Sequence, residues 1–231
     1  MKTLGIIGGV GPESTIDYYR SIIAAYRERK GDQSYPQFII NSIDLKREMD
    51  FIVNKDLPGL IRYLLEEIRK LAGAGADFAL IASNTPHLVF DDLQHQSPVP
   101  LVSIVEATCA RVKMLGLKRP GLLGTRFTMQ GNFYPDVFSR HGIELVVPLP
   151  DDRNYVHDKY MNELVNGIFL PETRSGLLAV IDRLKEKEKI DAVILGGTEL
   201  PLILRDDGDA GIPFLNTTKI HVEAALEIML S

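Results

Sequence analysis

The distribution of hydrophobic and polar positions along the chain predicts an alternation of buried strands and amphipathic helices. Short apolar runs with the length of buried strands occur at residues 4–7, 38–43, 78–82, 101–104, 143–147, 192–195 and 212–215. Longer segments with helical apolar spacing occur at residues 13–29, 57–72, 87–94, 105–115, 133–141, 151–166, 173–187 and 219–230. Strands that alternate with helices favour an α/β fold with mainly parallel sheets.

The order of elements in the first half of the chain resembles the order in the second half. A glycine-rich turn at residues 8–12 follows the first strand, and residues 121–129 repeat this design. We predict two similar lobes related by a pseudo-twofold, each a parallel sheet flanked by helices. The first lobe is expected to comprise residues 1–117 and 211–231, because the last strand and helix are expected to return to it. The second lobe is expected at residues 118–210, and an acidic loop is expected at residues 205–211.

Two of the predicted strands end abruptly in small polar residues. Residues 78–82 lead into Ser83-Asn84-Thr85-Pro86-His87, and residues 192–195 lead into Gly196-Gly197-Thr198-Glu199. Open α/β sheets bind their ligands at the carboxyl ends of the strands. The sequence therefore predicts a small-molecule site built from these two strand ends.

Composition and charge exclude several classes of function. The net charge of −5 lacks the basic footprint of a nucleic-acid-binding protein. Apolar runs are too short for a signal peptide or a membrane span. The single cysteine, Cys109, allows no internal disulfide, so we expect a cytoplasmic protein. The five histidines are scattered without metal-ligand spacing, and the glycine turn at residues 8–12 does not match the dinucleotide fingerprint. We therefore expect neither a metal nor a cofactor.

Two further residues have more than one interpretation. Arg47 lies in a polar loop or short helix at residues 45–50, just past a strand end. It is either the bidentate partner of a substrate carboxylate or a solvated surface arginine. Cys109 lies in the middle of a predicted helix, away from the strand ends, and is expected to be a small core residue rather than a nucleophile.

The polar motifs resemble those of the aspartate/glutamate racemase family, the cofactor-independent amino-acid racemases. The resemblance rests on residues 8–15, 83–87, 124–129 and 196–201, which occur in the family's order over nearly the whole chain. It implies two similar lobes, an active-site cleft between them and, often, a homodimer. It also implies an isomerase that acts on a small carboxylate or amino acid.

In that family two cysteines exchange the substrate's α-proton, one on each face of the α-carbon. The matching positions in this chain are Ser83 and Gly197, and Cys109 aligns with neither. A serine hydroxyl needs a neighbouring base, and glycine has no side chain to offer. The resemblance therefore implies Ser83 as a catalytic residue, assisted by Glu199 or His87, although His87 is equally suited to capping or packing a helix.

The substrate-binding positions of the family are better preserved than its cysteines. The matching residues that hold the α-carboxylate and amino group are Asn84, Thr85, Thr125, Thr128 and Thr198. Glu199 is the natural partner of a substrate ammonium group, and Arg47 is the candidate for a distal carboxylate.

The function predicted from these residues is α-proton abstraction from a small carboxylate, an acidic amino acid in the first instance, by a racemase without either family cysteine. Two alternatives remain open. One is a lyase-type enzyme of the same fold that works on one face only. The other is a non-catalytic protein that binds an amino acid or carboxylate. Glu163 is a further acid that either reaches the site or is a solvated helix carboxylate.

Overall fold

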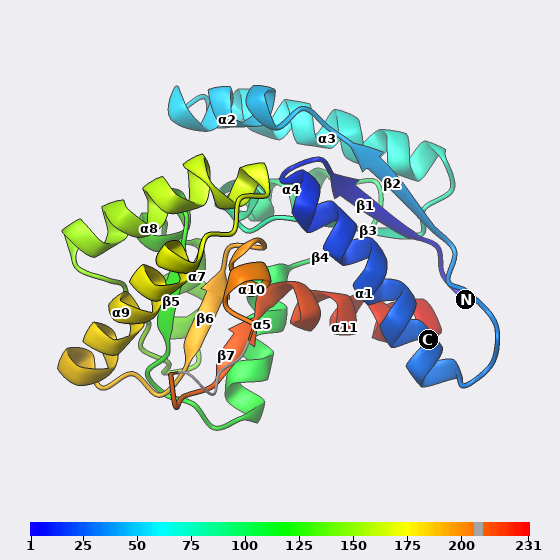
Figure 1. The fold of residues 1–231 in the computed structure, drawn as a ribbon. Helices are drawn as coiled ribbons and strands as arrows, with labels where there is room; N and C mark the ends of the chain where they lie inside the picture. Colours follow the sequence, from blue (N-terminus) through cyan, green and yellow to red (C-terminus); the bar gives the residue numbers. More distant parts are fainter. Residues whose placement is uncertain (206–209) are drawn as a thin grey trace. The chain divides into compact units, whose positions relative to one another are not determined.

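The computed structural model describes residues 1–205 and 210–231, so most of the predicted acidic loop lies outside the described residues. The chain forms two compact units. We call residues 1–104 with 221–231 the first unit and residues 105–220 the second unit. Each contains a parallel sheet flanked by helices, which confirms the predicted α/β class (Figure 1).

The first unit contains a four-stranded parallel sheet in the order β2-β1-β3-β4. Its strands are β1 (Leu4–Gly8), β2 (Phe38–Ser42), β3 (Phe78–Ile81) and β4 (Leu101–Val102). Its helices are α1 (Pro12–Lys30), α2 (Leu45–Val53), α3 (Leu57–Gly73), the 3-10 helix η1 (Thr85–Val89) and α4 (Phe90–Gln96). Helix α11 (Thr217–Leu230) enters this unit at His221.

Alternate residues of the central strands of this sheet face opposite layers of helices. Leu4 and Ile6 of β1 pack with Phe78 and Leu80 of β3 against the apolar sides of α1 and α11. Residues between them face α3, where Gly5 lies close to Leu71 and Ala76. Burial on both faces explains why these strands are continuous apolar runs in the sequence.

The second unit contains a three-stranded parallel sheet in the order β5-β6-β7. Its strands are β5 (Gly121–Gly124), β6 (Val193–Gly196) and β7 (Phe214–Asn216). Its helices are α5 (Ile104–Met114), α6 (Arg126–Gln130), α7 (Phe133–Ser139), α8 (Pro150–Asn162), the 3-10 helix η2 (Leu164–Asn166), α9 (Pro171–Glu188) and α10 (Leu200–Ile203). Residues from α8 and α9 pack against Leu123, Val193 and Leu195 of the sheet.

Three expectations about the chain's organisation need correction. Residues 143–147 form no full strand but a single bridge between Val146 and Gly121, because Pro148 has no N–H with which to extend the ladder. The last strand does not return to the first lobe, since β7 pairs with β6. The units divide at residues 104/105 and 220/221 rather than at 117/118 and 210/211, so helix α5 and strand β7 lie in the second unit. Helix α11 does return to the first unit, as expected.

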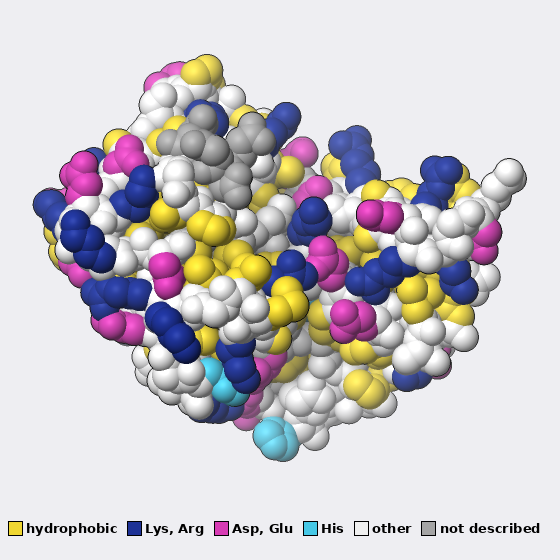
Figure 2. Space-filling view, turned by 90° about the horizontal axis from the view of Figure 1, so that it is seen from below, with side chains coloured by type: hydrophobic (Ala, Val, Ile, Leu, Met, Phe, Trp, Pro, Cys, Tyr) yellow, Lys and Arg dark blue, Asp and Glu magenta, His cyan; other side chains and the backbone are white. Residues whose placement is uncertain are grey.

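Two observations concern the charged surface and the lengths of the helices. Figure 2 shows one face of the molecule, on which Lys and Arg side chains lie among Asp and Glu side chains rather than in one basic patch. Among the described residues, no helix has the length and apolar character needed to span a membrane. Cys109 is buried, which confirms its prediction as a core residue, and burial raises the pKa of its thiol.

Candidate functional site

In the first unit, the candidate residues lie at the carboxyl ends of two adjacent strands. Strand β1 leads into the glycine turn, and its neighbour β3 leads into Ser83, Asn84 and Thr85. Ser83 is partly exposed, whereas Asn84 and Thr85 are buried. Because the two strands are parallel, the glycine turn and the polar segment emerge at the same edge of the sheet.

The glycine turn is fixed by contacts with its own helix and with β3. Gly9 has φ 79°, and a Cβ there would lie 2.4 Å from the carbonyl oxygen of Ile43, so only glycine fits. The N–H of Gly9 donates to Thr15 Oγ1 at 2.8 Å, and Ser14 Oγ donates to the carbonyl oxygen of Ala82 at 2.9 Å. These bonds hold the start of α1 against the residue that precedes Ser83.

His87 is packed inside the first unit as a neutral ring. Its Nε2 accepts the N–H of Ile104 at 3.2 Å, and the ring stacks on Phe90 with the centroids 4.7 Å apart. Burial lowers the pKa of His87 to about 3. Because Nε2 already accepts a hydrogen bond, this arrangement favours a packing role for His87 over a catalytic role.

Arg47 lies on α2, so the segment predicted to be a polar loop or a short helix is helical. The Asp44 carboxylate caps this helix by accepting the N–H of Lys46 at 2.9 Å. Arg47 is exposed, and its guanidinium carbon lies 4.4 Å from the centre of the Tyr63 ring. This cation–π contact orients the side chain without burying its charge.

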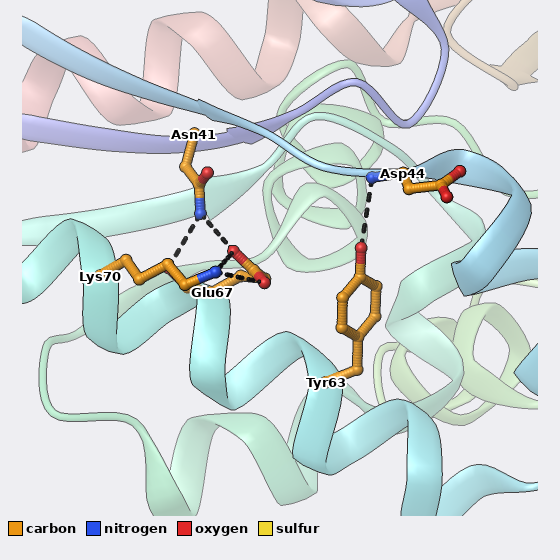
Figure 3. A network of polar contacts seen from close by, with 5 residues as sticks. All are labelled: Asn41, Asp44, Tyr63, Glu67 and Lys70. Atoms are coloured by element: carbon orange, nitrogen blue, oxygen red, sulfur yellow. Dashed lines mark hydrogen bonds and ion pairs between the residues drawn. The ribbon is translucent and has the colours of Figure 1, made fainter.

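Tyr63 belongs to a polar network on the same side of the unit (Figure 3). The N–H of Asp44 donates to the Tyr63 hydroxyl at 3.2 Å, while Glu67 accepts bonds from Asn41 at 2.7 Å and from Lys70 at 2.7 Å. Burial raises the pKa of Glu67, but these two bonds together with nearby positive charge lower it overall. The carboxylate is therefore an anchor between β2 and α3, not a free base.

In the second unit, the first strand end is organised by two buried threonines. Thr125 caps α6, since its Oγ1 accepts the N–H of Thr128 at 3.2 Å. The two hydroxyl oxygens also lie 3.2 Å apart. The Thr125 side chain thus has a structural role as the N-cap of a helix that begins directly after β5, and the Thr128 hydroxyl lies against it.

The second strand end of this unit holds a buried hydroxyl–carboxylate cluster. Thr198 Oγ1 donates to Glu199 Oε2 at 3.0 Å, and the Tyr160 hydroxyl donates to the same oxygen. Burial, followed by the neighbouring Glu199 carboxylate, raises the pKa of Tyr160 well above its ordinary value. Gly197 directly precedes Thr198 in the chain and is also buried.

The sequence interpretation missed Tyr160. The residue shares the apolar side of α8 with Val156, and helical periodicity alone makes it a core position. Its partner Glu199 lies far along the chain, so no local motif signals the contact. Glu163, by contrast, is bonded to Lys159 and Thr173 and ties α8 to α9.

No metal-binding cluster is formed by the described residues: nowhere among them do three or more His, Cys, Asp or Glu side chains gather in a suitable arrangement. What the structure does provide is hydroxyl, amide and carboxylate groups at the carboxyl ends of parallel strands in each unit. This arrangement is typical of the class of α/β proteins that bind small polar molecules at their strand ends.

Comparison with known proteins identifies the family within that class. The sequence model of the Asp/Glu/Hydantoin racemase family matches residues 7–225, and the chain belongs to this family. The solved structure of a Yersinia pestis protein assigned to the Asp/Glu racemases is 34% identical, with a TM-score of 0.90 and 100% coverage of both chains. That of an aspartate racemase homologue from Pyrococcus horikoshii is 35% identical, with a TM-score of 0.86 and the same coverage.

An activity appears in the name of a more distant relative. The broad-specificity amino-acid racemase of Bacillus subtilis is 24% identical over 99% of this chain and 98% of its own length. Both the family and the fold expected from the sequence motifs are thereby confirmed.

Proposed function

We propose that this protein abstracts the α-proton of an amino acid with a carboxylate side chain and acts as an amino-acid racemase. The observation that carries the proposal is the placement of the polar motifs. Asn84 and Thr85 follow β3, while Thr198 and Glu199 follow β6, each at the carboxyl end of a parallel strand. The names of the relatives, which include an aspartate racemase homologue and a broad-specificity amino-acid racemase, support the substrate class.

In this proposal the charged groups select the substrate. Glu199 is the partner of the substrate ammonium group. Arg47, exposed and oriented by Tyr63, is the partner of the distal carboxylate. Asn84, Thr85 and Thr198 supply amide and hydroxyl groups for the α-carboxylate, and Thr125 and Thr128 shape the neighbouring strand end.

Ser83 is the proposed proton-transfer residue of the first unit. It is partly exposed and directly follows the end of β3 and Ala82. A serine hydroxyl is a weak base, so a neighbouring ionisable group must take its proton. We do not assign this role to His87, because its Nε2 already accepts the N–H of Ile104.

A second candidate function is favoured by the residues at the family's cysteine positions. With a hydroxyl at Ser83 and no side chain at Gly197, one-sided chemistry is the simpler outcome, as in a lyase that removes a proton without inverting the carbon. The other alternative is a non-catalytic protein that binds the carboxylate without converting it.

The deciding experiment is incubation of the purified protein in heavy water with each enantiomer of aspartate and glutamate. Proton NMR measures deuterium uptake at the α-carbon, and chiral chromatography measures inversion. Uptake with inversion supports the racemase. Uptake with retention supports one-sided chemistry, and saturable binding without uptake supports the binding protein. If none of these acids binds or reacts, the proposed substrate class is wrong.

A further inference from the structure

Tyr160 fills the space that a side chain at position 197 would need. A Cβ built on Gly197 would lie 2.3 Å from Cε2 of the Tyr160 ring and 3.0 Å from its hydroxyl oxygen. Such distances are far inside van der Waals contact. Position 197, just past β6, therefore has no side chain, and the phenol ring of Tyr160 from α8 occupies the space beside it.

The hydroxyl of this phenol is bonded to a carboxylate that lies two residues past Gly197. Tyr160 and Thr198 both donate to Glu199 Oε2, the latter at 3.0 Å. Tyr160 is 6% exposed and Glu199 1% exposed. Since burial and the carboxylate both oppose ionisation of the phenol, the pKa of Tyr160 is raised and the ring stays neutral. The phenol is therefore the donor of this bond and the carboxylate oxygen its acceptor.

Packing alone does not explain this arrangement. A phenylalanine at position 160 would fill the same volume, and a buried carboxylate costs several kcal/mol of desolvation unless it is paired. Groups that hold a carboxylate in a buried polar cluster at a strand end are typical of functional sites. The hydroxyl–carboxylate pair therefore points to chemistry at this strand end.

We propose that Tyr160 and Glu199 form a proton relay that serves one enantiomer of the substrate, an inference that rests on the proposed function. In abstraction, the α-C–H bond breaks, its electron pair stays on the substrate as an enolate, and the proton bonds to the phenol oxygen. The phenol's own proton moves at the same time to Glu199 Oε2, so the ring remains neutral. In donation each step runs in reverse, and the carboxylate is regenerated.

The test is the substitution Tyr160→Phe, which keeps the ring and removes only the hydroxyl. The control is Tyr155→Phe on the same helix, because the Tyr155 hydroxyl lies against Gly176 of α9 rather than against Gly197. Exchange of the α-proton for deuterium is measured separately from the L and the D enantiomers of aspartate and glutamate, and circular dichroism checks the fold. We expect Tyr160→Phe to slow exchange from one enantiomer by about 100-fold or more and to spare the other, with no such bias in the control.

The outcomes separate the relay from the proposed function. If the unmodified protein exchanges no α-proton, the proposed function fails and the relay has no reaction to serve. If it exchanges both enantiomers and Tyr160→Phe leaves both rates unchanged, or slows them equally, the relay alone is overturned. Selective loss of exchange from a single enantiomer, in a folded variant, is the result that supports it.

Discussion

Glu48 gives the stability of this protein a dependence on pH that one substitution should remove. The residue lies on α2, is only 1% exposed, and its Oε2 has no hydrogen-bond partner among the described residues. Burial raises the pKa of its carboxyl to about 8 from an ordinary value of 4.5. The folded protein therefore keeps this proton up to about pH 8, whereas the unfolded chain releases it above pH 4.5.

The sign of the effect follows from that difference. Between pH 4.5 and pH 8 the folded state binds one more proton than the unfolded state, so the free energy of unfolding falls as the pH rises. One proton is worth about 1.4 kcal/mol per pH unit, and the slope halves as the pH reaches the folded-state pKa, so this group removes about 1.6 kcal/mol between pH 6.5 and pH 8. In the Glu48→Gln variant no proton is lost, and this decrease should disappear.

Urea denaturation followed by circular dichroism measures the effect, since the chain has no tryptophan for fluorescence. The free energy of unfolding is compared at pH 6.5, 7.25 and 8 (chosen to span the window) for the unmodified protein, Glu48→Gln and the control Glu66→Gln, which changes an exposed carboxylate on α3. Below about pH 4.5 Glu48 is protonated in both states, so there the profiles should run parallel. If the profiles of Glu48→Gln and the unmodified protein run parallel from pH 6.5 to 8 as well, Glu48 ionises without penalty and the reasoning is refuted.

Three further substitutions test the candidate site. Ser83→Ala should lower the rate of α-proton exchange by about 100-fold, and an unchanged rate in the NMR assay would remove Ser83 from the mechanism. Arg47→Gln should raise the KM for aspartate roughly 10-fold or more while leaving kcat within about twofold, because a charge-assisted bond to the distal carboxylate is lost; equal effects on aspartate and alanine would argue against this role. Gly197→Ala should destabilise the fold by about 1–3 kcal/mol, since its Cβ meets the Tyr160 ring at 2.3 Å. Gly73→Ala, whose Cβ meets nothing within 4 Å, is the control in thermal melts, and equal melting temperatures would contradict the clash.

The hydrophobic pattern predicted the elements better than it predicted how they pair. Residues 78–82 and 192–195 were recognisable as strands because burial on both faces makes them continuously apolar. The same pattern does not show which sheet a strand joins, so β7 was expected in the first lobe although it pairs with β6. Residues 143–147 have the composition of a strand but form one bridge, because ladder hydrogen bonds depend on the partner and on Pro148.

Local sequence predicted the position of those candidate residues that directly follow their own strand. Ser83 and Thr198 lie just after apolar runs, and that juxtaposition alone places them at strand ends. The hydrogen-bond partners of the candidate residues could not be predicted in the same way. Thr125 was expected to contact a ligand, yet its hydroxyl also caps α6. His87 accepts the N–H of Ile104 through Nε2, a bond between residues 17 positions apart that no local motif signals.

Position 197 shows why a motif comparison by itself is an incomplete guide to chemistry. Judged by sequence alone, glycine at that position removes a functional side chain and nothing replaces it. In the folded chain, the ring of Tyr160 on α8 occupies the volume beside Gly197. The hydroxyl of this ring donates a hydrogen bond to Glu199. In the proposed relay, the neighbouring helix α8 supplies the group that the glycine lacks. The substitution that distinguishes loss from replacement is Tyr160→Phe, because it changes the hydroxyl and leaves the packing in place.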